Sequence, residues 1–165
     1  MKKVAIILGS ESDRETVNAS LDYYEYFGIP LDIRVMSAHR NPEQVQQFAK
    51  TAAEEGYGVI VACAGMAAHL PGVIAAYTTL PVIGVPLGGS ELNGVDALYS
   101  IVQMPAGVPV ATMAIGGARN AGLMAVRILG ASDPALREAM VRFQASLEAM
   151  VVEKDAAVQA KFAGQ

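Results

Sequence analysis

Apolar residues gather in five short runs, and the stretches between these runs carry apolar residues at intervals of three and four. The runs lie at residues 3–8, 31–36, 59–64, 82–85 and 110–115. Most of them are continuously apolar, which is typical of strands covered by helices on both faces. Because each run is followed by glycine or polar residues and then by a helical pattern, the chain is predicted to alternate strand and helix around a parallel sheet.

Capping residues mark where the helices are expected to begin. Ser12 followed by Glu15 has the pattern of a capping box, and Asn41 followed by Pro42 predicts a second helix start. Glycines at 28 and 56 are expected to end these two helices. Later helices are predicted over residues 68–77, 95–102 and 120–129.

A final helix is expected to begin near Asp133 and Pro134, where an N-cap residue precedes proline at the first helical position. Its apolar residues recur at steps of four and three, at Leu136, Met140, Phe143, Leu147 and Met150. Such a stripe suits packing against another helix or a sheet. Packing within the chain and packing on a neighbouring subunit both remain open at this point.

These elements predict one α/β domain with a flavodoxin-like, doubly wound, five-stranded parallel sheet in the order 2-1-3-4-5. Helices on both faces would make three αβα layers, with residues 1–130 as the core and residues 131–165 as an extra C-terminal helix, expected at a subunit interface. A chain of 165 residues is the size of one domain. Ligands are expected beyond the carboxyl ends of the strands, where the strand order reverses.

Composition and charge narrow the function classes. With 53% hydrophobic and 17% charged residues, the chain is expected to fold compactly. The net charge of −4, without a basic stripe, excludes nucleic acid as the main partner. Residues 56–90 hold no Asp, Glu, Lys or Arg, yet glycines and prolines interrupt them, so buried strands and a helix are predicted there and no membrane partner is expected.

The first residues and the single cysteine bear on the cellular compartment. Lys2 and Lys3 precede only five apolar residues, without a small-residue cleavage site, so we expect a cytoplasmic protein. Cys63 cannot form an internal disulfide, and its apolar surroundings predict a buried, inert thiol.

Polar residues that could do chemistry come directly after the strands. After the first run, Gly9 is expected to turn the chain into a helix, where free backbone N–H groups with the hydroxyls of Ser10 and Ser12 would cradle a phosphate. Asp13 would repel phosphate but suits ribose hydroxyls. Turn formation and capping alone would explain the same residues equally well.

After the second run come Ser37, Ala38, His39 and Arg40. The arginine supplies the fixed cation that an acidic protein needs for a phosphorylated ligand. The histidine can change its protonation near neutral pH, and its neighbours favour a catalytic role over an ordinary surface position.

After the third run, small residues would let the backbone approach a planar ligand closely. Gly65, Ala67, His69 and Leu70 are the candidates in this loop. A metal site is not expected, because no Asp, Glu or Cys lies in register with the two histidines. The glycine-rich loop at 86–94 could close over the site or be an ordinary surface turn.

Other phosphate-binding classes fit less well. A dinucleotide-binding enzyme should show G-x-G-x-x-G after the first strand, and this chain does not. A phosphoacceptor module would need Asp at the end of the third strand, where Ala64 stands. A flavodoxin-like FMN carrier would share the fold, but the three site loops lack an aromatic residue to stack on a flavin.

Four longer motifs occur in this order: Gly-Ser-Glu-Ser-Asp at 9–13, Ser-Ala-His-Arg at 37–40, Ala-Ala-His-Leu-Pro-Gly at 67–72, and Leu-Asn-Gly-Val-Asp-Ala-Leu-Tyr-Ser-Ile-Val-Gln-Met-Pro at 92–105. With them the chain resembles, from about residue 4 to 129, the PurE family of purine biosynthesis. The second motif and His69 are similar to the class I form, the N5-carboxyaminoimidazole ribonucleotide mutases. The related class II carboxylases resemble the chain less at both places.

The resemblance implies roles for the loop residues. Ser10, Asp13 and Arg40 would contact the ribonucleotide, and His39 would be the general acid/base. Ser37, Ala38 and the segment 65–70 would line the pocket for the base and the carboxylate. It further implies release and recapture of CO2, no cofactor, and a homo-octamer with sites between subunits.

Two departures from the family pattern and two alternatives remain. Met66 stands where many members have a second glycine, which puts a close backbone contact with the ligand at that position in question. The segment 115–120 is shorter than in some members, so no ligand contact is assigned there. The alternative enzyme activity is direct carboxylation of aminoimidazole ribonucleotide with CO2. The alternative outside enzymes is the FMN carrier.

Overall fold

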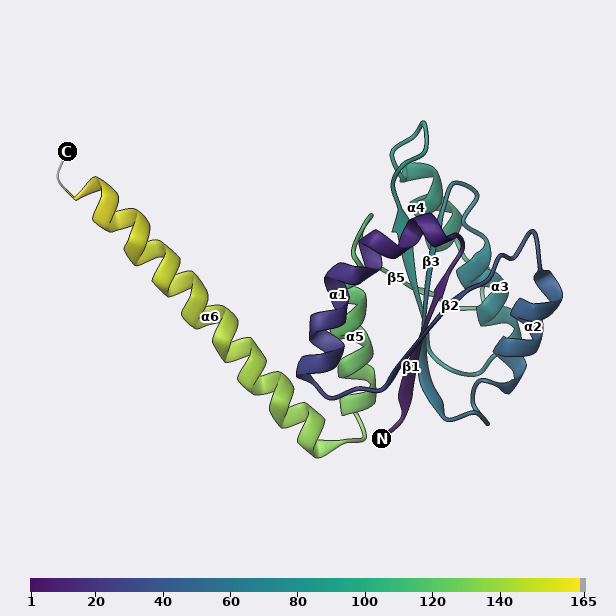
Figure 1. Cartoon of the computed structure of the whole chain (residues 1–165), viewed down its shortest axis with the longest axis horizontal. Helices are drawn as coiled ribbons and strands as arrows, with labels where there is room; N and C mark the ends of the chain where they lie inside the picture. Colours follow the sequence, from purple (N-terminus) through teal and green to yellow (C-terminus); the bar gives the residue numbers. More distant parts are fainter. Residues whose placement is uncertain (164–165) are drawn as a thin grey trace.

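The fold is a parallel five-stranded sheet between two layers of helices, described by a computed structural model over residues 1–163 (Figure 1). The strand order is β2-β1-β3-β4-β5, and every neighbouring pair is parallel. The strands are β1 Lys3–Leu8, β2 Leu31–Val35, β3 Tyr57–Gly65, β4 Val82–Leu87 and β5 Ala111–Thr112. The predicted topology is therefore confirmed.

Six α-helices and one short 3-10 helix connect and follow these strands. They are η1 Glu11–Asp13, α1 Arg14–Tyr26, α2 Pro42–Thr51, α3 Leu70–Tyr77, α4 Val95–Val102, α5 Ala118–Gly130 and α6 Pro134–Phe162. The expected range 131–165 for the last helix includes residues 164–165, which lie outside the described residues. Within the described chain, no helix is both long enough and apolar enough to span a membrane.

The alternation of side chains along β1 divides the core between the two faces of the sheet. Val4, Ile6 and Leu8 face the cluster formed with α1, α5 and the start of α6. Ala5 and Ile7 face the cluster formed with α2, α3 and α4. Since both faces of β1 are buried, its sequence is continuously apolar, as the sequence pattern indicated.

The edges of the sheet differ from the prediction in length. The fifth run, expected over 110–115, forms hydrogen-bonded strand only at Ala111–Thr112. This strand lies at an edge and pairs with β4 alone, through Ile83 and Gly84. The Met113 N–H still donates to the Gly84 carbonyl at 2.9 Å, but the regular strand ends at Thr112, which the apolar pattern does not reveal.

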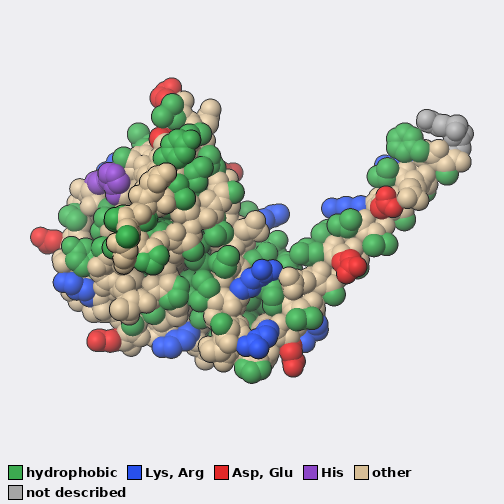
Figure 2. Space-filling model, turned by 180° about the vertical axis from the view of Figure 1, so that it is seen from behind, with side chains coloured by type: hydrophobic (Ala, Val, Ile, Leu, Met, Phe, Trp, Pro, Cys, Tyr) green, Lys and Arg blue, Asp and Glu red, His purple; other side chains and the backbone are tan. Residues whose placement is uncertain are grey.

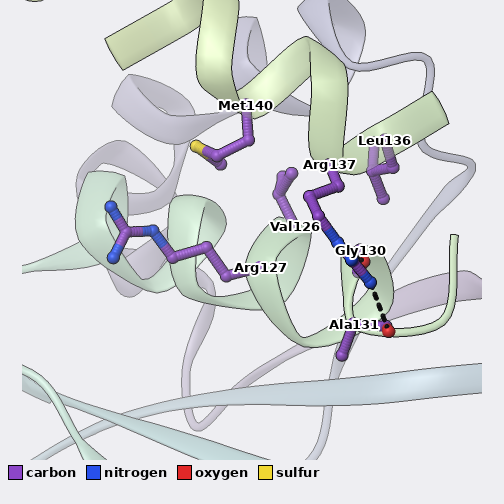
Figure 3. A pocket seen from close by; sticks show the side chains of 7 residues that line it. All are labelled: Val126, Arg127, Gly130, Ala131, Leu136, Arg137 and Met140. Carbon is purple, nitrogen blue, oxygen red and sulfur yellow. Dashed lines mark hydrogen bonds between the residues drawn. The ribbon is translucent and has the colours of Figure 1, made fainter. Parts of the chain in front are cut away.

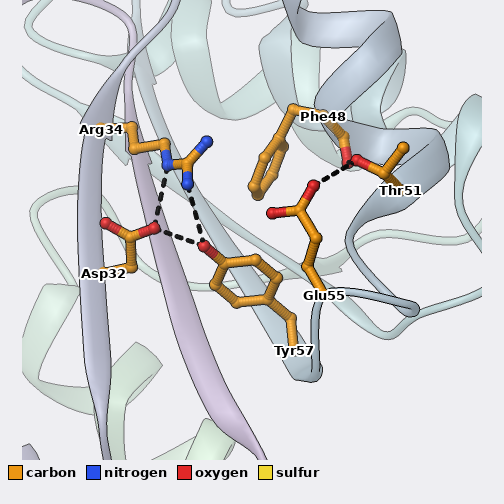
Figure 4. A network of polar contacts seen from close by, with 6 residues as sticks. All are labelled: Asp32, Arg34, Phe48, Thr51, Glu55 and Tyr57. Atoms are coloured by element: carbon orange, nitrogen blue, oxygen red, sulfur yellow. Dashed lines mark hydrogen bonds and ion pairs between the residues drawn. The ribbon is translucent and has the colours of Figure 1, made fainter.

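The other edge strand, β2, is tied to the sheet by polar side chains (Figure 4). The Arg34 Nε donates to Asp32 Oδ2 at 2.9 Å, and the hydroxyl of Tyr57 on β3 donates to the same carboxylate. Burial, followed by the Asp32 contact, raises the pKa of Tyr57 to about 12, and that hydrogen bond lowers the pKa of Asp32. This network therefore spans β2 and β3 across β1.

The long helix α6 leaves the domain after its first turns (Figure 1). It begins as predicted at Asp133, whose Oδ1 accepts a hydrogen bond from the Leu136 N–H at 3.1 Å. Leu136 and Met140 are buried, and the Phe143 ring lies edge-on to Tyr23 and Phe27. The apolar stripe therefore packs within the chain at its beginning, whereas its later members Leu147 and Met150 are exposed.

Candidate functional site

The loops that follow β1, β2, β3 and β4 line a pocket of about 440 Å³ that is open to solvent. All eleven residues predicted for the site line it: Ser10, Ser12, Asp13, Ser37, Ala38, His39, Arg40, Gly65, Ala67, His69 and Leu70. The loops meet because the carboxyl ends of four adjacent parallel strands lie at one edge of the sheet. The histidine side chains form one patch on the body of the domain, away from the extended helix (Figure 2).

The loop after β1 is organised by Asp13. The Ser10 N–H donates to Asp13 Oδ2 at 2.9 Å, and the Ser12 hydroxyl donates to Ser10 Oγ at 2.9 Å. The first helical turn therefore begins at Ser10, two residues before the expected cap at Ser12, because the carboxylate reaches back from position 13. Burial raises the pKa of Asp13, an effect opposed by the hydrogen bond from Ser10.

The loop after β2 turns around the side chain of Ser37. Its hydroxyl oxygen accepts from the backbone N–H groups of His39 at 3.4 Å and Arg40 at 3.3 Å. The Ser37 N–H in turn donates to Asn41 Oδ1 at 2.6 Å, just before α2. These contacts hold the backbone of His39 and Arg40 while both side chains stay exposed at the pocket.

The two histidines are in direct contact. Nε2 of His39 lies 2.8 Å from Nδ1 of His69, and the ring planes are inclined at 89°. They come from different loops, since His39 follows β2 and His69 immediately precedes α3. The structure thus brings together two groups that can each hold or release a proton.

The loop after β3 explains one departure from the family pattern. Met66 has a φ of +56°, in the left-handed region that glycine adopts without steric cost. Its side chain is 68% exposed at the pocket. None of the residues 115–120 lines this pocket, so the shorter segment there leaves its described lining unchanged.

Five lining residues were not among the predicted site residues: Gly9, Ala64, Met66, Gly88 and Gly89. The four small residues contribute backbone and small surfaces, and Met66, within the segment 65–70 that the resemblance placed in the lining, contributes an apolar side chain, so residue type gave no chemical signal. The two glycines after β4 belong to the glycine-rich loop, and that loop was the signal that could have found them.

No part of the described chain places three or more His, Cys, Asp or Glu side chains together to hold a metal ion. Cys63, directly behind the pocket on β3, is fully buried as predicted. Burial raises the pKa of its thiol to about 12, so the thiol stays protonated.

A second, smaller pocket of about 120 Å³ lies between α5 and the start of α6 (Figure 3). Arg137 donates from Nη2 to the carbonyl oxygen of Ala131 at 2.8 Å and from Nε to that of Gly130 at 3.3 Å. These bonds satisfy carbonyl groups at the end of α5. Arg137 therefore joins the two helices, and none of the predicted site residues lies here.

Comparison with known proteins agrees with this arrangement. The AIR carboxylase family matches residues 3–150. The chain belongs to this family. A Mycobacterium tuberculosis protein named N5-carboxyaminoimidazole ribonucleotide mutase is 55% identical over 95% of this chain and 90% of its own length. A Synechocystis protein of the same name is 52% identical over 94% of this chain and 89% of its own length.

Structural comparison leads to the same family. The crystal structure of Treponema denticola PurE superposes with a TM-score of 0.85 at 27% identity, covering 94% of this chain and 98% of that one. The PurE resemblance inferred from the four motifs is therefore confirmed. One further relative, from Schizosaccharomyces pombe, is named phosphoribosylaminoimidazole carboxylase; it is 50% identical over 92% of this chain, which corresponds to 27% of its own length.

Proposed function

We propose that this chain is an N5-carboxyaminoimidazole ribonucleotide mutase, an isomerase of de novo purine biosynthesis. The observation that carries the proposal is the meeting of His39 and Arg40 with the Ser10–Asp13 loop in one pocket. Relatives that bear the mutase name and are more than half identical over nearly the whole chain support it.

In the proposed reaction, the imidazolium of His39 protonates the carbamate nitrogen of the substrate. The bond between that nitrogen and the carboxyl carbon then breaks and releases CO2. The imidazole carbon of the nucleotide attacks this CO2, and His39 removes the proton that the carbon carried. Because the histidine regains the proton that it gave, the cycle needs no cofactor and no net proton.

The other loops would hold the ribonucleotide. Arg40 provides a fixed positive charge for the phosphate, and the hydroxyls of Ser10 and Ser12 line the same pocket as further polar groups. Asp13 faces the same pocket and suits the ribose hydroxyls. The small residues Ala38, Gly65 and Ala67, together with Ser37, His69 and Leu70, would surround the base and the carboxylate.

A carbamate assay tests this proposal. The purified chain is supplied with N5-carboxyaminoimidazole ribonucleotide in bicarbonate-free buffer, and formation of the carbon-carboxylated nucleotide is followed. We expect conversion at a rate that added bicarbonate does not raise. His39→Asn should abolish turnover and leave nucleotide binding largely intact, with far-UV circular dichroism as the control for folding.

Direct carboxylation of aminoimidazole ribonucleotide is the second candidate, and the name of the Schizosaccharomyces pombe relative favours it. It predicts no conversion of the carbamate and a rate that rises with CO2 when aminoimidazole ribonucleotide is supplied. A visible absorbance spectrum of the purified chain separates both enzymes from an FMN carrier, which would show a bound flavin.

We also infer a homo-octamer in the cytoplasm. In support of assembly, α6 carries exposed apolar residues beyond Phe143, and α4 exposes Val95, Tyr99 and Val102 at helical spacing. The number of eight follows from the PurE resemblance.

A further inference from the structure

The contact between the two histidines constrains where the catalytic proton can lie. Nε2 of His39 and Nδ1 of His69 are 2.8 Å apart, which is the distance of a hydrogen bond. A neutral imidazole has one N–H donor and one acceptor nitrogen. One of these two nitrogens must therefore carry a hydrogen and the other must not.

The backbone around His69 is held more firmly than that around His39. The His69 N–H donates to the Ala67 carbonyl at 2.8 Å, and the His69 carbonyl accepts from the Val73 N–H at 2.9 Å in α3. The His39 N–H has only the longer contact to Ser37 Oγ, at 3.4 Å. Among the described residues, the His39 ring has no side-chain hydrogen-bond partner other than His69.

Two consequences follow for the protonation of the pair. The tautomers of the neutral rings are linked, because a hydrogen on His39 Nε2 requires a bare Nδ1 on His69, and the reverse. Two imidazolium rings would direct N–H groups at each other, so the contact accommodates one positive charge at most. Because Nε2 of His39 forms the hydrogen bond with His69, the other ring nitrogen of His39, Nδ1, is the one available to substrate.

The charged groups nearby are few. Asp13 on the β1 loop and Arg40 beside His39 are the other titratable or charged side chains among the described lining residues. Neither of them is a hydrogen-bond partner of the His39 ring among the described residues. The contact with His69 is therefore the side-chain hydrogen bond that orients this ring.

We propose that His69 is a positioning residue for His39: it orients the ring and sets its tautomer through the Nε2 to Nδ1 hydrogen bond. The role in turnover rests on the proposed mutase function, while the hydrogen bond itself does not. This goes beyond lining the pocket, because it assigns to His69 an effect on the catalytic rate rather than on substrate affinity.

Two substitutions separate positioning from simple contact with substrate. In His69→Asn the side-chain amide stands near the place of Nδ1 and can still donate to or accept from His39, but it does not titrate. In His69→Leu the side chain has similar bulk and no polar atom. His69 is exposed, so both variants should fold, and far-UV circular dichroism checks this.

The first measurement is nitrogen-15 NMR of the histidine rings in the free protein. The wild-type chain should show complementary tautomers for His39 and His69. In His69→Leu, the His39 ring nitrogens should shift toward the averaged values of an unconstrained imidazole. In His39→Asn, the His69 ring should change in turn. Unchanged His39 shifts in the leucine variant would overturn the proposal without any reference to activity.

The second measurement is the kinetics of the carbamate reaction. His69→Leu should lower kcat about 10- to 100-fold, with KM little changed and an altered pH profile of kcat. His69→Asn should recover much of that loss. A raised KM with unchanged kcat in both variants would contradict positioning and leave His69 as a binding residue. If the wild-type chain converts no carbamate, the proposed function fails, while NMR still decides whether the hydrogen bond exists.

Discussion

At the scale of single residues, the pocket is lined by two side chains of opposite charge, Arg40 and Asp13. Arg40 is the one cationic side chain with fixed charge among the described lining residues, and it forms no ion pair within residues 1–163. An arginine without an internal partner retains its donors for an anionic ligand. The carboxylate of Asp13 accepts from the Ser10 N–H through Oδ2 and keeps further acceptor sites for ribose hydroxyls.

Arg40→Ala should weaken substrate binding more than it slows turnover. Loss of a charge-assisted hydrogen bond to phosphate costs about 1.5–3 kcal/mol, which raises KM roughly 10- to 100-fold. Steady-state kinetics with the carbamate substrate measures this effect. Arg127→Ala, on the rim of the smaller pocket between α5 and α6, is the matched control and should leave KM unchanged. An unchanged KM in Arg40→Ala would remove this residue from the phosphate site.

At the scale of elements, the edge strand β2 depends on side-chain bonds as well as on its ladder. Lys3 on β1 places its ammonium 4.0 Å from the centre of the Tyr57 ring, and that ring packs edge-on against Phe48 of α2. The Tyr57 hydroxyl then reaches Asp32 and Arg34. One buried ring thereby connects β1, β2, β3 and α2 (Figure 4).

Tyr57→Phe isolates the hydroxyl, because phenylalanine keeps the ring packing. The variant should lose about 1 kcal/mol of unfolding free energy near neutral pH. The pKa of Tyr57 is raised from 10.0 to about 12 by folding, so the neutral phenol stabilises the fold below pH 10, and this stabilisation is lost as the pH rises through about 12.

The difference in unfolding free energy between wild type and Tyr57→Phe should therefore become smaller at high pH. Denaturant titrations at neutral pH and between pH 10 and 12 measure it. The same network also has an acid limit: the pKa of Asp32 is lowered from 3.8, so the contribution of its carboxylate to the stability of the fold is present above pH 3.8 and declines as the pH falls below that value. A difference that stays constant from neutral to alkaline pH would show that the hydroxyl bonds do not stabilise the fold.

The contact between α4 and the sheet requires glycine at position 84 of β4. A Cβ there would overlap Cγ2 of Ile101 on α4 and lie 2.9 Å from Cγ1 of Val110. Both neighbours are β-branched, and Ile101 is fully buried, so neither can rotate away freely.

Gly84→Ala should destabilise the fold by about 1–3 kcal/mol through overpacking against α4. Chemical denaturation measures the loss. In the double variant Gly84→Ala with Ile101→Ala, the combined cost should be smaller than the sum of the two single costs, because the second substitution removes the clash. Additive costs would show that α4 is not what opposes a side chain at position 84.

At the scale of the whole molecule, a compact α/β body carries a long exposed helix. An α-helix rises about 1.5 Å per residue, so the 29 residues of α6 extend about 44 Å. Val151 is 63% exposed and Val152 is 64% exposed, far from the packed start of the helix. Isolated helices gain little stability without a packed apolar face, so the exposed apolar residues of this arm are consistent with the proposed assembly.

Sedimentation or light scattering of the full chain should give eight times the chain mass of 17.2 kDa. Val151→Asp combined with Val152→Asp should shift the chain toward smaller species while the monomer stays folded, because both positions are exposed within it. Glu153→Gln, on the same stretch, is the control that should keep the assembly. A monomeric wild-type chain would contradict the proposed octamer.

Much of this molecule could be predicted from its order of apolar and polar residues. Continuous apolar runs identify strands buried on both faces, and the Asp133-Pro134 pair identifies the start of α6, because both depend on local chemistry. The loops that form the site could be named because parallel strands bring the loops after their carboxyl ends together, and the PurE resemblance supplied the individual residues within those loops.

Other features are decided only when distant residues meet. The cap at Ser10 depends on how Asp13 folds back, and the short β5 depends on where its pairing with β4 stops. The hydrogen bond between His39 and His69 joins residues thirty positions apart, so no local pattern encodes it. Sequence by itself determined which chemical groups follow each strand, since the positions of strands and loops along the chain follow from periodicity. Tertiary structure alone decided which atoms face each other there, because a hydrogen bond forms only when donor and acceptor lie within a few tenths of an ångström of their preferred separation.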